Sequence, residues 1–268
     1  MSARHGTIER VPGKDERREA LKGVFHEARG CTRCPQLAET RHNVVFGSGN
    51  ADADVMFIGE APGRHEDEQG LPFVGQAGAL LDRLLGEVGL TRDEVFIANV
   101  LKCRPPGNRD PHPVEIDNCQ DYLLRQVALI QPTVICSLGN FSTKLLRGDP
   151  TGITRLHGRD EILTIGTRAV RLLPLFHPAA ALYTPSNVEV LRRDFARIPQ
   201  LLAMGPPAQP EGVPDEHPAV PDPGLAMAEP DVAELGPELT PVTGPEPEQQ
   251  QPRQDESEPV PAAQLGLF

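Results

Sequence analysis

Polar residues follow three short apolar runs of the chain, at points where a strand would end. Glu60 stands in a GEAPG turn, Asn99 closes the run VFIAN, and His177 follows LLPLF. A carboxylate can activate water, an amide presents a donor beside an acceptor, and a neutral histidine held in place by a following proline can donate a hydrogen bond. Open α/β sheets bind ligands at the carboxyl ends of their strands, so we expect these side chains to share one crevice.

Cysteines form a second group with possible chemistry, in the pattern C-x2-C-x68-C-x15-C. Its members are Cys31, Cys34, Cys103 and Cys119. Four thiolates can hold a tetrahedral zinc ion or a 4Fe–4S cluster, and spacing alone does not separate the two. Isolated cysteines usually pack in cores, but a C-x2-C hook followed by proline favours ligation. The fifth cysteine, Cys136, lies in a β-rich apolar run and is expected in the core.

Strand-like and helix-like segments alternate along the chain. The sequence predicts strands at 55–58, 95–100, 134–137 and 170–175. It predicts helices at 16–30, 77–89, 113–130, 140–147 and about 187–203. This alternation favours a parallel sheet with helices on both faces. We therefore predict a three-layer α/β/α fold with a central four-stranded parallel sheet, and a small hairpin or loop over 152–168.

Net charge divides the chain near residue 204. Residues 205–268 carry one basic residue, Arg253, against thirteen acidic ones, and this segment accounts for the whole net charge of −12. It also holds fifteen of the 29 prolines. Such a composition cannot bury enough apolar surface to offset chain entropy. We therefore expect a folded domain over 1–204 and a disordered acidic, Pro-rich tail over 205–268.

The N-terminus carries no feature of a secretory signal. Its first 22 residues are rich in charge and contain no apolar run, and no segment of the chain has the length and apolarity to span a bilayer. We expect a cytoplasmic protein with no membrane partner, whose cysteines do not form disulfides.

Several short motifs gather around the GEAPG turn. They are the acidic pair Glu66 and Asp67, the box PFVG at 72–75 and the helix start AGALL at 77–81. With the four cysteines, these motifs resemble a type-4 uracil-DNA glycosylase of the uracil-DNA glycosylase superfamily, over about residues 27–202. The resemblance implies a base excision repair enzyme that flips uracil out of DNA and hydrolyses its N-glycosidic bond.

The resemblance also implies roles for residues at the strand ends. The implied uracil contacts are Gly59, Glu60, Ala61, Phe73, Asn99 and His177. Phe73 would stack on the base, Asn99 would match uracil O4 and N3–H, and His177 would stabilise negative charge on O2. Glu60 and His177 are the catalytic candidates. In the best-known relatives an aspartate activates water at the position of Ala61, so the general base stays open. Taken alone, Phe73 is more often a core residue, Asn99 a turn former and His177 a cap.

DNA contacts are expected beyond the base itself. Leu182 is implied as the wedge that enters the duplex, and it is followed by Tyr183 where a basic residue was expected. Gly139 and Asn140 begin a helix whose free N–H groups can hold a phosphate. Four basic residues are expected either as backbone contacts or as solvated surface: Lys102, Arg104, Arg109 and Arg155.

For the cysteines, the resemblance implies one structural 4Fe–4S cluster, with zinc as the lesser alternative. The implied substrate is uracil-containing DNA, single- or double-stranded. The chain ends in QLGLF, which is similar to the bacterial sliding-clamp binding motif and is formed by Gln264, Leu265, Leu267 and Phe268. We therefore expect a bacterial, nucleoid-associated monomer with the sliding clamp as a partner.

Other classes of function stay open. One is a catalytically idle module that binds DNA or damage, and another is a redox-sensing iron–sulfur protein on the same fold. The set Glu60, Asn99 and His177 favours the enzyme. A closer relative bonds covalently to DNA through a histidine-bearing insertion. No such basic insertion lies between Pro105 and Cys119, although His112 stands in that loop.

Overall fold

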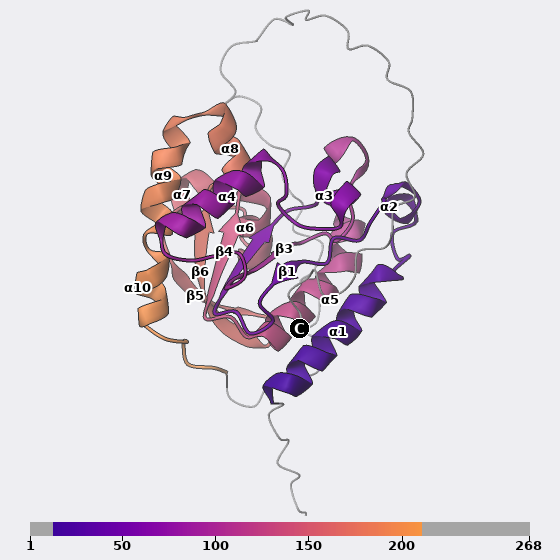
Figure 1. Cartoon of the computed structure of the whole chain (residues 1–268), viewed down its shortest axis with the longest axis horizontal. Coiled ribbons are helices and arrows are strands. Elements are labelled where there is room, and N and C mark those ends of the chain that lie inside the picture. Colours follow the sequence, from indigo (N-terminus) through magenta and orange to yellow (C-terminus); the bar gives the residue numbers. More distant parts are fainter. Residues whose placement is uncertain (1–12, 211–268) are drawn as a thin grey trace, which may run out of the picture.

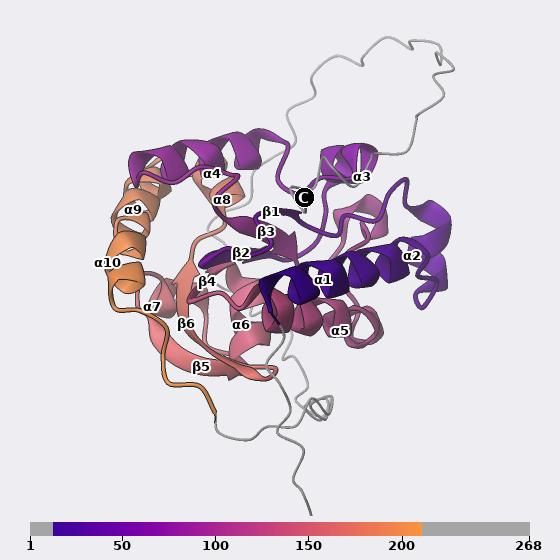
Figure 2. The same cartoon turned by 60° about the horizontal axis from the view of Figure 1, so that its bottom comes forward.

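The computed structural model describes residues 13–210, in which helices flank a central sheet (Figures 1 and 2). Its strands are β1 (Ser48–Gly49), β2 (Val55–Gly59), β3 (Phe96–Asn99), β4 (Val134–Leu138), β5 (Glu161–Ile165) and β6 (Arg168–Leu175). Its helices are α1 (Lys14–Arg29), α2 (Pro35–Thr40), α3 (Arg64–Gln69), α4 (Gln76–Glu87), the 3-10 turn η1 (Pro106–Asn108), α5 (Pro113–Ile130), α6 (Asn140–Arg147), α7 (Ile153–Leu156), α8 (Pro178–Tyr183), α9 (Ser186–Phe195) and α10 (Ile198–Ala203).

The sheet has the strand order β1-β3-β2-β4-β6-β5. The four central strands β3, β2, β4 and β6 are parallel, which confirms the predicted centre. Two antiparallel edge strands extend it: β1 pairs with β3, and β5, which lies in the segment 152–168 where a small hairpin or loop was expected, pairs with β6. The central strand β2 is buried along its whole length, as is typical of parallel strands covered on both faces, whereas edge strand β5 alternates between exposed and more buried positions.

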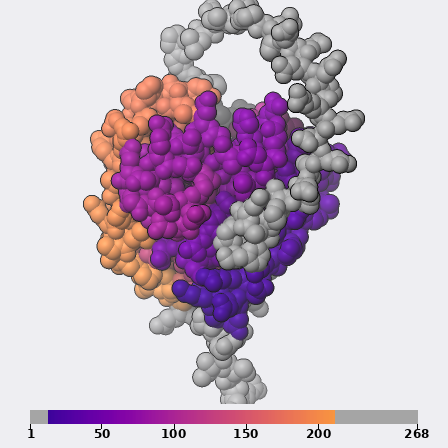
Figure 3. Space-filling view, in the orientation of Figure 1, coloured from indigo at the N-terminus to yellow at the C-terminus, as the bar shows by residue number. Residues whose placement is uncertain are grey.

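Two apolar cores lie on opposite faces of the sheet and complete the three-layer arrangement. Met56 and Ile58 of β2 belong to the core that α1 and α5 cover, and Val55 and Phe57 belong to the core that α4, α9 and α10 cover. The alternation follows from the two-residue period of a strand. Helices α4 and α9 lie side by side on the molecular surface (Figure 3). Cys136 is fully buried in the second core, as expected.

The helices differ from the prediction in two ways. The segment 187–203 is two helices, α9 and α10, because Pro199 has no N–H and its ring would clash with the carbonyl four residues earlier. In the first turn of α10 the same proline is tolerated. The structure also contains four short α-helices where the sequence predicted none, namely α2, α3, α7 and α8. Of these, α3 lies in the polar segment after the GEAPG turn and is ended by Gly70 in the left-handed conformation.

The described chain continues past residue 204 and contacts β6. The Gln209 side chain accepts the Ala169 N–H (3.1 Å) and donates to its carbonyl (3.0 Å), and Arg171 Nε donates to the Gly205 carbonyl (3.3 Å). The boundary at 204, the disordered tail and the peptide at 264–268 stay predictions, because residues 211–268 lie outside the described part. Within residues 13–210, no helix combines the length and apolarity that a membrane crossing requires.

Candidate functional site

Strand β2 ends at Gly59, on which two of the predicted base-binding side chains converge. Gly59 pairs with Asn99 across β2 and β3. A Cβ at Gly59 would lie 2.3 Å from Asn99 Oδ1 and 2.8 Å from Phe73 Cζ. Any larger residue would push these groups apart, so glycine is what lets the amide and the ring meet at this strand end.

Phe73 takes a strained backbone conformation that its neighbours hold in place. Its φ is 54°, in the left-handed region that bulky residues rarely adopt. Arg92 donates to the carbonyls of Pro72 (2.9 Å) and Phe73 (2.7 Å), and Glu66 Oε1 accepts the N–H groups of Val74 (3.1 Å) and Gly75 (3.3 Å). These bonds fix the ring as a rigid wall of the site.

Glu66 and Asp67 both hold neighbouring loop segments in place through hydrogen bonds. Asp67 is buried and accepts the N–H of His42 (3.0 Å), and its Oδ2 contacts the His42 ring at 2.8 Å. These structural bonds account for the positions of both carboxylates, so neither is assigned a role in the chemistry.

His177 lies beside the Phe73 ring, with ring centroids 5.5 Å apart and an interplanar angle of 27°. It caps α8, and its Nδ1 accepts the Ala179 N–H at 3.1 Å. Burial lowers the pKa of His177 to about 4, although Glu66 opposes this shift. The ring is therefore neutral at neutral pH. Because Nδ1 accepts, the proton is assigned to Nε2, which is left as a fixed donor.

The turn that follows strand β4 packs against His177. Gly139 has φ 91°, and a Cβ there would lie 3.1 Å from His177 Cβ. The next residue is Asn140, whose Oδ1 accepts the Ile153 N–H at 3.1 Å. Its Nδ2 group and the first backbone N–H groups of α6 are donors of the kind that a phosphate contact at this turn requires.

Glu60 follows Gly59 and is partly buried. Burial raises the pKa of its carboxyl, and the negative charge of Asp110 raises it further. Its backbone carbonyl accepts the Leu101 N–H at 3.0 Å, which ties the GEAPG turn to the chain after β3. The adjacent Ala61 packs against the first core.

The structure therefore brings together five residues: Gly59, Phe73, Asn99, His177 and Gly139. Glu60 follows Gly59 in the chain. Leu182 lies on α8 with 41% of its surface exposed, and Tyr183 is 88% exposed. A pair of exposed apolar side chains on a short helix after the histidine suits a surface that meets a partner.

The four predicted ligand cysteines line one cavity, although they come from three segments. Cys31 and Cys34 flank the start of α2, Cys103 follows β3, and Cys119 lies within α5. All are free thiols. Among the described residues, no three His, Cys, Asp or Glu side chains are grouped as ligands of a single metal ion.

Each of the four sulfurs has a hydrogen-bond donor. Arg41 donates to Cys103 Sγ (3.3 Å), the Lys102 N–H to Cys119 Sγ (3.2 Å) and the Asn118 amide to Cys34 Sγ (3.6 Å). Burial would raise the pKa of Cys31, but hydrogen bonds from Tyr122 and Arg33 outweigh it and lower the pKa. Donors of this kind stabilise sulfur that carries negative charge.

The other three thiols favour the protonated form when nothing is bound. Burial raises the pKa of Cys34 and of Cys103, and raises that of Cys119 to about 12. Ligation requires thiolates, so loading this site must release protons. The donor set fits a metal group, because buried thiols surrounded by N–H donors have no evident function as neutral core residues.

Lys102 corrects one sequence interpretation. It was expected on the surface, yet it is 1% exposed. Its Nζ donates to the Asn99 carbonyl (2.8 Å) and to Gln126 Oε1 (2.6 Å). Burial lowers the pKa of Lys102 to about 8, against the opposing influence of Cys119 and Cys103. The only signal in the sequence was a lysine inside the otherwise apolar run before Cys103.

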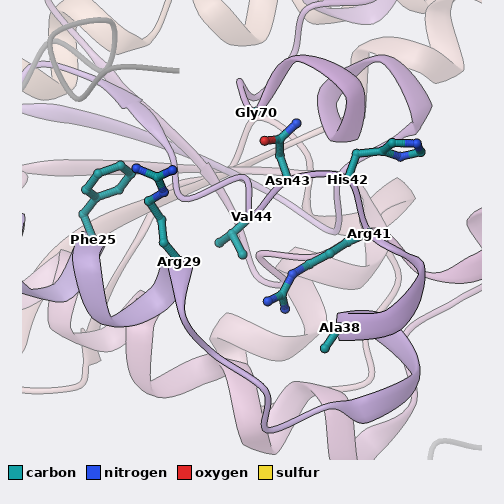
Figure 4. A pocket seen from close by; sticks show the side chains of 8 residues that line it. All are labelled: Phe25, Arg29, Ala38, Arg41, His42, Asn43, Val44 and Gly70. Carbon is teal, nitrogen blue, oxygen red and sulfur yellow. The ribbon is translucent and has the colours of Figure 1, made fainter. Parts of the chain in front are cut away.

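Arg41 was also missed, and it separates the cysteines from an open cavity. Its Nη1 contacts Cys103 Sγ, and its Nη2 donates to the Cys31 carbonyl at 2.8 Å. On the other side lies a cavity of about 310 Å³ between α1, α2 and residues 41–44. In Figure 4 the Arg41 side chain points into this cavity, and Phe25 and Arg29 reach it from α1.

Comparisons with known proteins give one consistent result. The family model of the uracil DNA glycosylase superfamily matches residues 46–200. The type-4 uracil-DNA glycosylase of Archaeoglobus fulgidus is 43% identical over 187 residues, which are 68% of this chain and 94% of the relative. That of Saccharolobus solfataricus is 45% identical over 188 residues (68% and 87%), and that of Thermotoga maritima 44% identical over 172 residues (64% and 88%).

Proposed function

This chain belongs to the type-4 uracil-DNA glycosylases, and we propose that it excises uracil from DNA by hydrolysing the N-glycosidic bond and leaving an abasic site. The observation that carries the proposal is that Asn99 and Phe73 meet at Gly59 while His177 lies beside the Phe73 ring. A base-excising enzyme needs a ring to stack on, an amide to read the base edge and a donor for the departing base.

Base recognition is assigned to Asn99 and Phe73. The Asn99 amide can accept from uracil N3–H and donate to O4, whereas cytosine presents the opposite pattern at these two atoms. The Gly59, Glu60 and Ala61 backbone would lie along the base edge. The rigid Phe73 ring supplies the stacking surface, and its fixed position limits the pocket to a planar ring.

Stabilisation of the leaving base is assigned to His177. Bond cleavage places negative charge on uracil O2 and leaves an oxocarbenium-like sugar. The neutral ring with its proton on Nε2 can donate to that oxygen, and the Ala179 N–H holds the ring so that no reorientation is needed. A preorganised donor of this type acts where charge develops in the transition state.

Glu60 is assigned to the attacking water. Its raised pKa places it closer to the operating pH than an ordinary carboxylate, which suits a general base. It also stands beside the base-binding turn, where it can exclude the 5-methyl group of thymine.

Contacts to DNA outside the pocket are assigned to α8 and α6. Leu182 is exposed and follows His177 by one short helix, which suits a wedge that fills the space of the flipped nucleotide. The N–H groups after Gly139 suit a phosphate.

The four cysteines are assigned to one 4Fe–4S cluster, which would supply structural cross-linking between α2, α5 and the end of β3. Zinc is the lesser alternative. Four thiolates could hold either group, and the similarity to the type-4 glycosylases is what favours the cluster.

The remaining assignments concern the tail and the partners. We assign catalysis to residues 1–204 and clamp binding to the peptide at 264–268, in a bacterial protein that acts as a monomer at the nucleoid. Deleting 264–268 should abolish binding to the sliding clamp and preserve excision on a short oligonucleotide. Clamp binding that survives the deletion would contradict this assignment.

The deciding experiment is excision on fluorescent oligonucleotides that contain one deoxyuridine, in single- and double-stranded form. The chain is purified without oxygen, and iron content and visible absorbance are recorded. Alkali-labile breaks only at uracil, with thymine and hypoxanthine strands as controls, would support the proposal. A chain with full iron content that binds the strands without breaking them would instead be an idle binding module.

A further inference from the structure

Lys102 connects the two candidate sites through two hydrogen bonds and through its place in the chain next to Cys103. Its Nζ donates to the carbonyl of Asn99, the predicted reader of the base (2.8 Å), and its backbone N–H donates to Cys119 Sγ (3.2 Å). The next residue in the chain is Cys103. Lys102 therefore lies between the base pocket and the cysteines, in the few residues that join them.

The Nζ group has only neutral hydrogen-bond partners. Gln126 Oε1 accepts from Nζ at 2.6 Å, and Gln126 Nε2 donates to the Phe46 carbonyl at 2.9 Å. Because both ends of the amide are bonded, its oxygen is held toward Nζ. In the described part of the chain, no ion pair joins Lys102 to a carboxylate, and this buried residue lines the same cavity as the four cysteines. A buried ammonium without an anion is costly.

We propose that Lys102 is a positioning residue that provides the counter-charge to the metal group held by the four cysteines and anchors the Asn99 end of β3. The inference rests on the proposed function of the base pocket and deepens it. One cation thereby links two tasks: it compensates the negative charge on the sulfurs, and it holds the backbone from which the Asn99 amide projects.

The physical reason is that both tasks use the same ammonium group. Removing the charge leaves the thiolate-bearing site without its buried cation. Removing the Nζ–H bonds takes a donor from the Asn99 carbonyl and from Gln126 Oε1, and buried acceptors that lose a donor tend to move until they are satisfied again. Lys102 should thus matter for iron retention through charge and for base reading through hydrogen bonding.

Three substitutions separate these two effects. Lys102→Met removes both the charge and the donors, Lys102→Gln removes the charge and keeps an N–H donor, and Lys102→Arg keeps the charge. The matched control is Lys22→Gln on α1, where the lysine pairs with Glu19 at 2.8 Å.

The first readout is iron retention of the full, loaded chain in the presence of a chelator, followed by visible absorbance. The Met and Gln variants should lose about 10- to 100-fold in iron affinity, the usual cost of an outer partner of a metal site. The Arg and Lys22→Gln variants should retain iron. Wild-type retention in both neutral variants would overturn the counter-charge role. If Lys102→Met does not fold, the contrast between the Gln and Arg variants still decides this point.

The second readout is the preference for uracil over thymine in binding to strands with a non-hydrolysable nucleotide. Lys102→Met should lower this preference about 10-fold, the equivalent of one lost hydrogen bond, and Lys102→Gln should retain most of it. A lower melting temperature with unchanged preference would overturn the anchoring role. A wild-type chain that fails to excise uracil would overturn the proposed function alone, because iron retention is measured without substrate.

Discussion

The base pocket and the cysteine site lie near each other at the end of β3, but they are built on different interactions. In the base pocket, glycines at Gly59 and Gly139 let side chains approach at distances that a Cβ would forbid. The groups that we propose to face the base are an amide, a phenyl ring and a neutral imidazole. Around the cysteines, Arg33, Arg41 and Lys102 surround the sulfurs with positive charge and N–H donors.

This difference indicates what each site is built to hold. Uracil is neutral and planar until the bond breaks, so a pocket of close steric walls with one fixed donor favours the transition state over the bound base. A group ligated by four thiolates carries negative charge in every state, and buried cations compensate it permanently. The pocket should therefore respond to changes of shape and hydrogen bonding, and the cysteine site to changes of charge.

The largest expected effect in the base pocket is that of His177→Ala. Loss of one preorganised donor should lower kcat for uracil excision by about 100- to 1000-fold, as measured by single-turnover cleavage. His177→Gln, which keeps an N–H donor, should recover part of the rate. Iron content should not change in either variant. If DNA affinity fell and kcat did not, His177 would be a binding residue only.

Asn99→Asp tests recognition of the uracil edge, and its expected effect is smaller than that of His177→Ala. The carboxylate cannot donate to uracil O4, so kcat/KM for uracil should fall by about 10- to 100-fold, which corresponds to about 1–3 kcal/mol for an unmatched buried polar group. Cytosine strands are assayed in parallel, because the acceptor now matches the cytosine amino group. Unchanged kinetics on both bases would place Asn99 outside the pocket.

The acid limb of the pH–rate profile tests Glu60, with an expected effect of a few-fold. The raised pKa of Glu60 means that its carboxylate is protonated at a higher pH than usual, so excision should fall early as the pH drops. Asp110→Asn removes a repulsive charge, lowers the pKa of Glu60 and should extend activity to lower pH. His177 stays neutral down to about pH 4 and cannot produce this limb. A limb that Asp110→Asn leaves in place would argue against Glu60 as the base.

Much of the frame could be predicted from the sequence, because it depends on local patterns. The four central strands are continuous apolar runs, and the helix over 113–130 shows a clear amphipathic period, so both were predicted within a few residues. The edge strand β1 has only two residues, Ser48 and Gly49, and its pairing depends on β3 rather than on its own sequence. Such a strand has no local signal.

The candidate site was predictable only in part, because some of its residues have a local signal in the sequence and others are defined only by tertiary contacts. Asn99 and His177 stand out as polar residues at the ends of apolar runs, and the C-x2-C hook stands out by spacing. The contacts of Arg41 and Lys102 with the cysteines join residues 62 and 17 positions apart. They arise from tertiary packing, which also explains why Lys102 was misinterpreted as a surface residue.

The smallest expected effect on excision is that of Arg41→Met, and it sharpens the contrast between the sites. Arg41 donates to Cys103 Sγ and to the Cys31 carbonyl, and it contacts no residue of the base pocket. Iron affinity under chelator should fall about 10-fold, whereas chains that still hold iron should excise uracil within about twofold of wild type. Arg29→Gln is the matched control, because Arg29 lines the same open cavity and lies over the Phe25 ring, 5.6 Å from its centroid. A large loss of excision by loaded Arg41→Met protein would mean that the cysteine site controls the base pocket through Arg41 as well as through Lys102.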